Sequence, residues 1–373
     1  MGDNDDNWWQ QPEPEPRPAE PKPEPEKPKP PQPKLPEQKP PPEPQQPGAG
    51  APAGGDGGGG GGCGLGAARF DHQHTCPAST GDTPHVGGPI IQGSENVNTN
   101  TKQQARVTDK LKCKTGPDDV IIEGSGTVLV NGWPAARRTS QTEHLPPQSQ
   151  IVEGSPDVNV GGPSMIIRVL PNGDLRIGKH IVVKGTKEFQ QKVVRKLGVI
   201  STTKSGQQTI ANIDANPKGY DLTIEEHRPG IDTDDSSVSG SGFLQKDGTP
   251  GAPSPTTLRL DPEHRMFEDY PDEATLHHEM IHADHHMWGV SRHYEATTDG
   301  WHNMEEWQTI SGGVNMPGGT QIPGVPMSPT ENMFTQERGW GYYRMDHGFD
   351  RKSWDLPNPP PPPPPTGAHD TRR

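Results

Sequence analysis

A short motif recurs three times between residues 85 and 162, and this repetition constrains the fold more than any other feature of the sequence. The copies begin at Ile91, Ile122 and Val152, which lie 31 and 30 residues apart, and each continues as Gly-Ser-x-x-Val after one further residue. Short β-branched runs that end at Asn or Gly, as in residues 128–132, are typical of hairpins rather than helices. The region is therefore predicted to be a small all-β body with threefold internal repetition.

Cysteine and histidine residues fall at matching positions of this body. Cys113 and His144 each stand seven residues after an equivalent arginine, so the symmetry of the repeats would bring their side chains to one end. His85 lies at the start of the first repeat, and Cys76 precedes it by nine residues. Two thiolates and two imidazoles suit a tetrahedral zinc ion, which would stabilise a body whose apolar core is small. These four residues are the predicted ligands of a structural zinc.

The repeat region resembles the PAAR family, conical β-repeat proteins that sharpen the spike of the bacterial type VI secretion system. The resemblance covers residues 74–162 and rests on Pro-Ala-Ala-Arg at 134–137, Pro-His-Val-Gly-Gly at 84–88 and the repeated Gly-Ser-x-x-Val. It implies a zinc-capped tip that sits on a VgrG spike trimer. Tips of this family often use three His and one Cys, so His74 remains an alternative to Cys76 as the fourth ligand.

Proline and glycine divide the rest of the chain, which has 373 residues with 47 Pro and 46 Gly. Pro alternates with Glu, Lys and Gln over residues 11–46, and residues 48–62 are mostly Gly, which predicts a stiff polyproline arm and a flexible segment after it. We therefore expect a disordered Pro-rich and Gly-rich arm at 1–62, the repeat domain at 63–163, a mixed α+β domain at 164–355 and a disordered Pro-rich tail at 356–373.

Charge and hydropathy exclude two classes of partner. A formal net charge of −14 argues against nucleic acid, because proteins that bind it concentrate Lys and Arg. No stretch approaches the ~20 apolar residues that span a bilayer, so no transmembrane segment is expected. Residues 1–7 are acidic where a signal peptide is basic and then apolar. We expect synthesis in the cytoplasm without a signal peptide and, for export, another route.

The motif that carries the predicted chemistry lies in a helix expected from about Asp272 to Trp288, with Gly289 just beyond its end. His278, Glu279 and His282 form a His-Glu-x-x-His pattern there. Because an α-helix has 3.6 residues per turn, the two histidines project from one face and can share a zinc ion. Glu279 lies beside them, where a carboxylate can take a proton from water. The sequence therefore predicts a zinc hydrolase.

A catalytic zinc needs three protein ligands and one open position. The Gly-x-x-His continuation that would supply the third ligand in metzincins is absent, so this ligand must come from elsewhere. Glu305 and Glu306 follow just over twenty residues downstream in a segment with helical character. We favour Glu305, because Thr309 would lie one turn on and could support the site, and Glu306 stays open. Tyr342 and Tyr343 are candidate hydrogen-bond donors to the tetrahedral oxyanion.

Several neighbouring features receive structural interpretations. Residues 328–331, Ser-Pro-Thr-Glu, read as a capping box that opens a helix with Pro at its first position, and Glu331 is assigned a structural role. The strand expected at 257–260 is a candidate edge on which an extended substrate could pair. His285 and His286 are expected to support the site or face solvent, although either could close it as a fourth ligand.

The C-terminal region is similar to the NleD-like zinc metallopeptidase effectors over roughly residues 180–345. The similarity rests on four blocks in order, at residues 257–262, 276–283, 305–309 and 329–332. It implies a zincin-like domain with a gluzincin-like site, in which two His and an acidic residue hold zinc. It also implies a protease that is delivered to act inside or on a foreign cell.

Together the two resemblances predict a type VI secretion effector in which a PAAR tip on VgrG carries its own zinc endopeptidase toxin into a target cell. One zinc would be structural and one catalytic, the substrate would be a target-cell protein or peptide, and an immunity protein would be encoded separately. Two alternatives stay open. The chain could be a non-enzymatic spike-tip adaptor with a structural zinc domain, or a hydrolase of cell-wall peptides.

Overall fold

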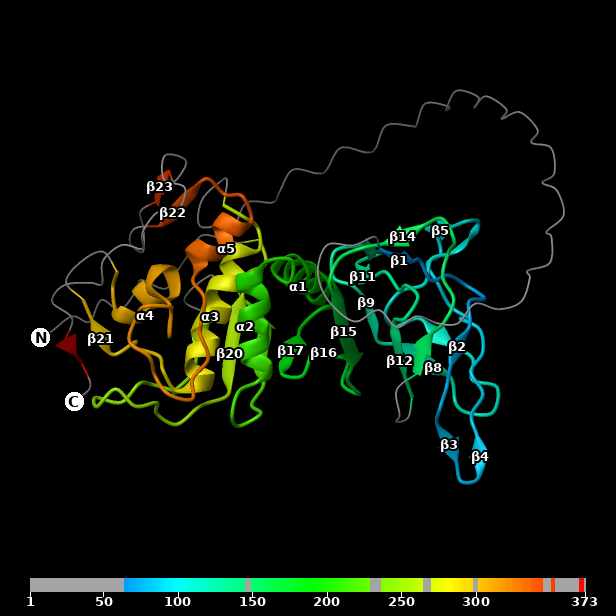
Figure 1. Ribbon diagram of the computed structural model, residues 1–373, viewed down its shortest axis with the longest axis horizontal. Helices are drawn as coiled ribbons and strands as arrows, with labels where there is room; N and C mark the ends of the chain where they lie inside the picture. The colour runs from blue at the N-terminus through cyan, green and yellow to red at the C-terminus, as the bar shows by residue number, and fades with distance from the viewer. Residues whose placement is uncertain are drawn as a thin grey trace, which may run out of the picture. The chain divides into compact units, whose positions relative to one another are not determined.

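The computed structural model describes residues 64–144, 149–228, 236–263, 270–297, 301–344, 350–352 and 369–371 (Figure 1). The predicted arm at 1–62 and the predicted tail at 356–373, apart from residues 369–371, lie outside them. A β-rich N-terminal part precedes a mixed α/β C-terminal part, which confirms the predicted order of fold types. Within the described residues, every helix is too short or too polar to cross a membrane.

Three two-stranded antiparallel ladders occupy equivalent places in the three repeats. They are β5 (Asn98–Thr99) with β6 (Lys102–Gln103), β10 (Leu129–Val130) with β11 (Trp133–Pro134), and β14 (Asn159–Val160) with β1 (Leu65–Gly66). The third ladder joins the two ends of the repeat region, because Leu65 pairs with Val160. An arginine that follows β1, Arg69, was not recognised in the sequence as the third member of the repeat set. Its side chain donates to the carbonyls of Thr99 and Asn100, in the turn of the next repeat.

The serine of each Gly-Ser-x-x-Val motif connects two repeats. Each hydroxyl accepts the N–H of the valine three residues later and donates to the residue that directly follows the strand at 98–99, 129–130 or 159–160 of another repeat. The three donated bonds, all 2.6 Å long, run from Ser94 to Asn131 Oδ1, from Ser125 to Gly161 O and from Ser155 to Asn100 Oδ1. The motif therefore closes the three repeats into a ring of hydrogen bonds.

Most of the other strands of the repeat region form a five-stranded antiparallel sheet and a hairpin. The sheet has the order β2 (His74–Thr75), β13 (Ser149–Ile151), β12 (Gln141–Glu143), β8 (Asp119–Ile121) and β7 (Lys110–Leu111), and the hairpin is β3 (Ser79–Thr80) with β4 (Thr83–Pro84). In Figure 1 this hairpin lies at the end of the repeat region opposite to β1, β5 and β14.

A seven-stranded sheet organises the C-terminal part. Its order is β19 (Ser236–Ser239), β20 (Thr256–Leu260), β18 (Leu222–Glu226), β17 (Ile181–Lys184), β16 (Leu175–Ile177), β15 (Ser164–Val169) and β9 (Glu123–Ser125). The ladders that join β17, β18 and β20 are parallel, and the other four are antiparallel. The expected edge at 257–260 is wrong, because β19 pairs with β20 on its outer side and becomes the edge itself. Its sequence, Ser-Ser-Val-Ser, has no strand-like apolar pattern.

Within the part of the chain that the structure describes, five helical segments accompany the sheet, together with two short ladders. The segments are α1 (Lys187–Ile200), α2 (Lys204–Asp214), α3 (Ala274–Trp288), α4 (Met304–Trp307) continuing into the π-helix η1 (Gln308–Gly312), and α5 (Glu331–Glu337). The ladders are β21 (Glu295–Ala296) with β24 (His369–Asp370), and β22 (Tyr342–Arg344) with β23 (Asp350–Lys352). Gly289 ends α3 with a φ of 72°, in the left-handed region that favours glycine. The predicted start of α5 is wrong by two residues, because Thr330 is its N-cap and its hydroxyl accepts the Met333 N–H at 3.2 Å.

Candidate metal centres

Helix α3 places the two predicted histidine ligands side by side. The Nε2 atoms of His278 and His282 are 3.0 Å apart, as expected for residues one turn apart on the same face. Both side chains are almost fully buried, because α3 packs on β20 and β19 and is covered by α2 and α5. Two nitrogen donors therefore converge on one point.

The carboxylate that joins them belongs to Glu306. Its Oε2 lies 3.5 Å from His278 Nε2 and its Oε1 lies 3.5 Å from His282 Nε2. Asn303 caps α4 by accepting the Glu306 N–H at 3.0 Å, which fixes the start of this short helix. Among the described residues, His278, His282 and Glu306 form one of two groups with donor atoms close enough to share a metal ion. We call these three residues the α3 group.

Glu305, the residue favoured from the sequence, lies on the other side of the His282 ring. Its Oε1 is 3.0 Å from His282 Nδ1 and 2.7 Å from His285 Nδ1, and its Oε2 accepts the Arg292 N–H at 2.8 Å. These contacts direct both of its oxygens away from the meeting point of the Nε2 atoms. The structure thus places Glu306, and not Glu305, with the two histidines.

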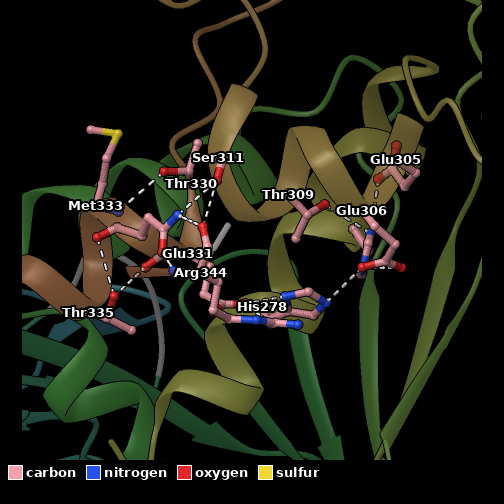
Figure 2. Close-up of polar contacts among 12 residues, drawn as sticks. His278, Glu305, Glu306, Thr309, Ser311, Thr330, Glu331, Met333, Thr335 and Arg344 are labelled. Atoms are coloured by element: carbon pink, nitrogen blue, oxygen red, sulfur yellow. Dashed lines mark hydrogen bonds and ion pairs between the residues drawn. The ribbon is translucent and has the colours of Figure 1, made fainter. Parts of the chain in front are cut away.

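Each histidine of the α3 group has an oxygen partner at its second ring nitrogen. His278 Nδ1 lies 2.6 Å from Glu331 Oε2 (Figure 2). His282 Nδ1 lies 3.1 Å from Thr309 Oγ1, in addition to its contact with Glu305. Such partners hold a ring so that Nε2 presents its lone pair. Two imidazoles supported in this way and one carboxylate are a donor set that fits zinc. The sequence suggested Thr309 as support for a site with Glu305 as ligand, and the structure places its hydroxyl beside His282; the contact of Glu331 was missed because it comes from a distant helix.

The ionisation of the α3 group is coupled. Burial opposes the charge on His278, but hydrogen bonds with Glu306 and Glu331 outweigh it and raise the pKa of His278 to about 9. The pKa of His282 is raised well above its usual range against the same effect of burial, mainly by the charge of Glu306. The pKa of Glu306 is held well below its usual range, despite burial, by the two histidines. Without a metal, the group is therefore a set of buried ion pairs.

Metal binding to the α3 group should consequently depend steeply on pH. A metal must displace the proton of His278, so apparent zinc affinity should rise about tenfold per pH unit per displaced proton as the pH increases towards 9. In the metal-free protein, His278 has a pKa of about 9 when folded and 6.5 when unfolded, so its protonation stabilises the fold. This stability is fully present below pH 6.5 and is lost as the pH rises through about 9. Chelator competition at several pH values measures the affinity, and a flat profile would contradict the ion-paired state.

The other predicted residues around α3 occupy distinct places. Glu279, half-buried, follows His278 on the helix, and burial raises the pKa of its carboxyl above the ordinary value. His285 Nε2 lies 3.1 Å from Ser328 Oγ, and the His286 ring packs edge-on against Phe243. Neither of these two histidines joins the α3 group. Tyr342 and Tyr343 lie in β22, and their side chains fall outside the described part of the structure, so the oxyanion role stays a prediction.

The second group of possible ligands lies in the repeat region. Donor atoms of Cys76, His85, Cys113 and His144 all lie within 4.8 Å of one another, and we call these residues the repeat group. His85 Nδ1 is 2.9 Å from His144 Nε2, and the Cys76 sulfur is 3.8 Å from the former atom and 3.6 Å from the latter. Neither described cysteine is in a disulfide. Four donors with no open position suit a structural zinc.

Polar partners also support the repeat group. His85 Nε2 lies 2.7 Å from Thr80 Oγ1, and His144 Nδ1 lies 3.5 Å from Asp119 Oδ2. The alternative ligand His74 is turned elsewhere, with its Nδ1 2.8 Å from Gly88 O and its Nε2 3.4 Å from Asp119 Oδ2. His74 thus contacts a neighbour of the repeat group rather than belonging to it.

A ring of three β-repeats with a four-donor group, followed by an α/β domain with a His-Glu-x-x-His helix, defines a two-part protein with two candidate metal centres. Comparison with protein families gives the same division: residues 80–145 match the PAAR motif, and residues 178–344 match the Peptidase_M91 family, described as effector protein. The chain therefore carries a PAAR motif followed by a Peptidase_M91 effector domain, which confirms both resemblances. The latter family suggests an effector of the metallopeptidase type. No curated protein matched the chain.

Proposed function

We propose that this protein is a type VI secretion effector whose C-terminal domain is a zinc-dependent endopeptidase. In this proposal residues 63–163 are the spike tip and residues 164–355 are the peptidase, with a zincin-like site. The observation that carries it is the convergence of His278 Nε2, His282 Nε2 and the Glu306 carboxylate on one point within the Peptidase_M91 match. The three residues are proposed to hold a catalytic zinc.

The chain's own residues divide the catalytic work. Zinc, when bound, supplies a Lewis acid that polarises the scissile carbonyl and makes water more acidic. Glu279 is proposed as the base that takes a proton from the attacking water and then donates it to the leaving amine. Burial raises the pKa of this carboxyl above its ordinary value, a direction that favours its taking up and later releasing a proton. Glu305 and Thr309 contact Nδ1 of His282 and so orient its ring.

The repeat group is proposed to hold the structural zinc of the tip. Three equivalent valines, Val97, Val128 and Val158, are each 38% exposed and follow the serines that close the ring. A threefold-repeated apolar surface of this kind is complementary to a trimer. It supports VgrG as the partner that the PAAR motif implies. The spike would then export the peptidase to its substrate in a target cell, with a separately encoded immunity protein protecting the producer.

Exposure of proteins to the purified chain tests the proposed activity. The zinc-loaded chain is incubated with whole proteomes and, separately, with purified cell-wall sacculi, and newly formed amino termini are labelled. We expect new termini in the proteome sample, and we expect these termini to be absent when the matched His278→Ala/His282→Ala variant is used. New termini in sacculi alone would favour the cell-wall alternative, and none in either would favour the non-enzymatic adaptor.

Paired substitutions distinguish the two glutamates. Glu306→Gln should lower zinc affinity of the C-terminal site by at least tenfold, because the amide is a much weaker ligand than a carboxylate. Glu305→Gln should lower affinity less, since it weakens only an indirect contact and leaves Thr309 in place. Chelator competition provides both values. A larger loss for Glu305→Gln would return that residue to the role of third ligand.

A further inference from the structure

We propose that Glu331 and Arg344 are a positioning pair that fixes the His278 ring for metal binding, which makes the β22 segment part of the metal centre. The inference rests on the proposed zinc site. Glu331 Oε2 lies 2.6 Å from His278 Nδ1 and 2.8 Å from Arg344 Nη1, so a single carboxylate oxygen joins the ligand histidine to the arginine. Figure 2 shows Glu331 and Glu306 approaching His278 from opposite sides.

Arg344 is held in place by two further segments. Its backbone N–H donates to Asn332 Oδ1 at 2.6 Å, and its carbonyl accepts from Asn332 Nδ2 at 2.8 Å and from Ser311 Oγ at 3.3 Å. Asn332 belongs to α5 and Ser311 to the π-helix η1, which continues the helix that carries Glu306. The backbone of Arg344 therefore fastens β22 to α5, which carries Glu331, and to η1, which continues the helix that carries Glu306.

The charges explain why a glutamate at this position needs an arginine. Glu331 and Arg344 are both fully buried, at 0% exposure. A carboxylate without a counter-charge is costly in such a place, and when zinc displaces the proton of His278, that ring no longer provides one. The guanidinium does so in either state. Glu331 can then remain the acceptor of the His278 Nδ1–H while Nε2 faces the metal.

The two ligand histidines differ in how many partners support them. His282 Nδ1 lies near two side-chain oxygens, from Glu305 and Thr309, whereas within the described residues the Nδ1 of His278 lies near one, from Glu331. Removal of Glu331 should therefore disturb the site more than removal of the Thr309 hydroxyl. Thr309→Val is accordingly a matched comparison for Glu331→Gln.

Zinc affinity and the spectrum of bound Co²⁺ test the pair in the full-length chain. Chelator competition is measured for wild type, Glu331→Gln, Thr309→Val and Arg344→Lys, with His278→Ala/His282→Ala defining the contribution of the repeat group. Glu331→Gln is expected to lower affinity at the C-terminal site 10- to 100-fold and to change the Co²⁺ absorption bands, with Thr309→Val causing a smaller loss. Arg344→Lys, which keeps the positive charge, should retain affinity between those of Glu331→Gln and wild type.

A double variant distinguishes a loss of zinc affinity from a failure of the protein to fold. Arg344→Met alone leaves Glu331 without its guanidinium partner, so Glu331→Gln/Arg344→Met, which removes both charges, provides a folded comparison. Its affinity should match that of Glu331→Gln, because the arginine acts through the glutamate. Affinity and Co²⁺ bands of Glu331→Gln equal to wild type would overturn the inference. If wild type and His278→Ala/His282→Ala bind the same number of zinc ions, the proposed zinc site itself would be refuted.

Discussion

Replacement of Glu279 by Gln should lower the rate of peptide hydrolysis by about 10²- to 10⁴-fold, which is the usual contribution of a general acid or base. Zinc content should stay unchanged, because Glu279 is not in the α3 group. The substitution keeps the size of a half-buried side chain and removes its ability to accept a proton. The measurement is the rate of cleavage of a protein substrate found in the proteome experiment, together with metal analysis of the same preparation.

Asp284 provides a matched control for this substitution. It lies on the same helix but is not in the α3 group, and its carboxylate accepts from Asn212 Nδ2 at 2.9 Å. Asp284→Asn is expected to cost stability rather than hydrolytic rate per folded molecule. Equal rates for wild type and Glu279→Gln would remove the proposed base and favour the adaptor alternative.

Loss of both cysteines of the repeat group should unfold the N-terminal domain much more readily than exchange of a cysteine outside the group. Structural zinc contributes about 10–16 kcal/mol to the folding of zinc-finger peptides, and even a fraction of that is comparable with the whole stability of a small domain. Cys76→Ser/Cys113→Ser should reduce zinc from two ions to one per chain, since the group in the C-terminal domain is separate. Metal analysis gives the stoichiometry, and hydrogen exchange locates the loss of protection.

Cys63→Ser serves as the control for this pair, because Cys63 is not among the predicted ligands. It should leave two zinc ions and normal protection. Retention of two zinc ions in Cys76→Ser/Cys113→Ser would contradict the assignment of the repeat group as a metal site.

Repetition made the repeat group predictable from sequence. Cys113 and His144 occupy the same position in successive repeats, so their meeting follows from symmetry and needs no knowledge of the fold. The same symmetry also implies a third arginine, and Arg69 was missed because it precedes the first motif instead of following the third. The pairing of β1 with β14 and the hydrogen bonds of the three motif serines show that the repeats close in a circle.

The His-Glu-x-x-His helix was predictable for a local reason, whereas the third donor was not. Periodicity and Gly289 define α3 and place His278 beside His282. Adjacent residues on a helix point about 100° apart, so the choice between Glu305 and Glu306 depends on how α4 is oriented. That orientation is set by the Asn303 cap and by the change to a π-helix at Gln308, neither of which a spacing argument captures. Glu331 reaches His278 across 53 positions of sequence, beyond any local pattern.

Pairing of Leu65 with Val160 also determines how this domain can be joined to other segments. The polypeptide enters and leaves the ring at neighbouring residues, on the side of β1, β5 and β14, while the β3–β4 hairpin points the other way (Figure 1). Additions before the first strand or after the last one therefore share a single point of attachment. Segments added at this point of attachment therefore begin on the side of the ring away from the β3–β4 hairpin.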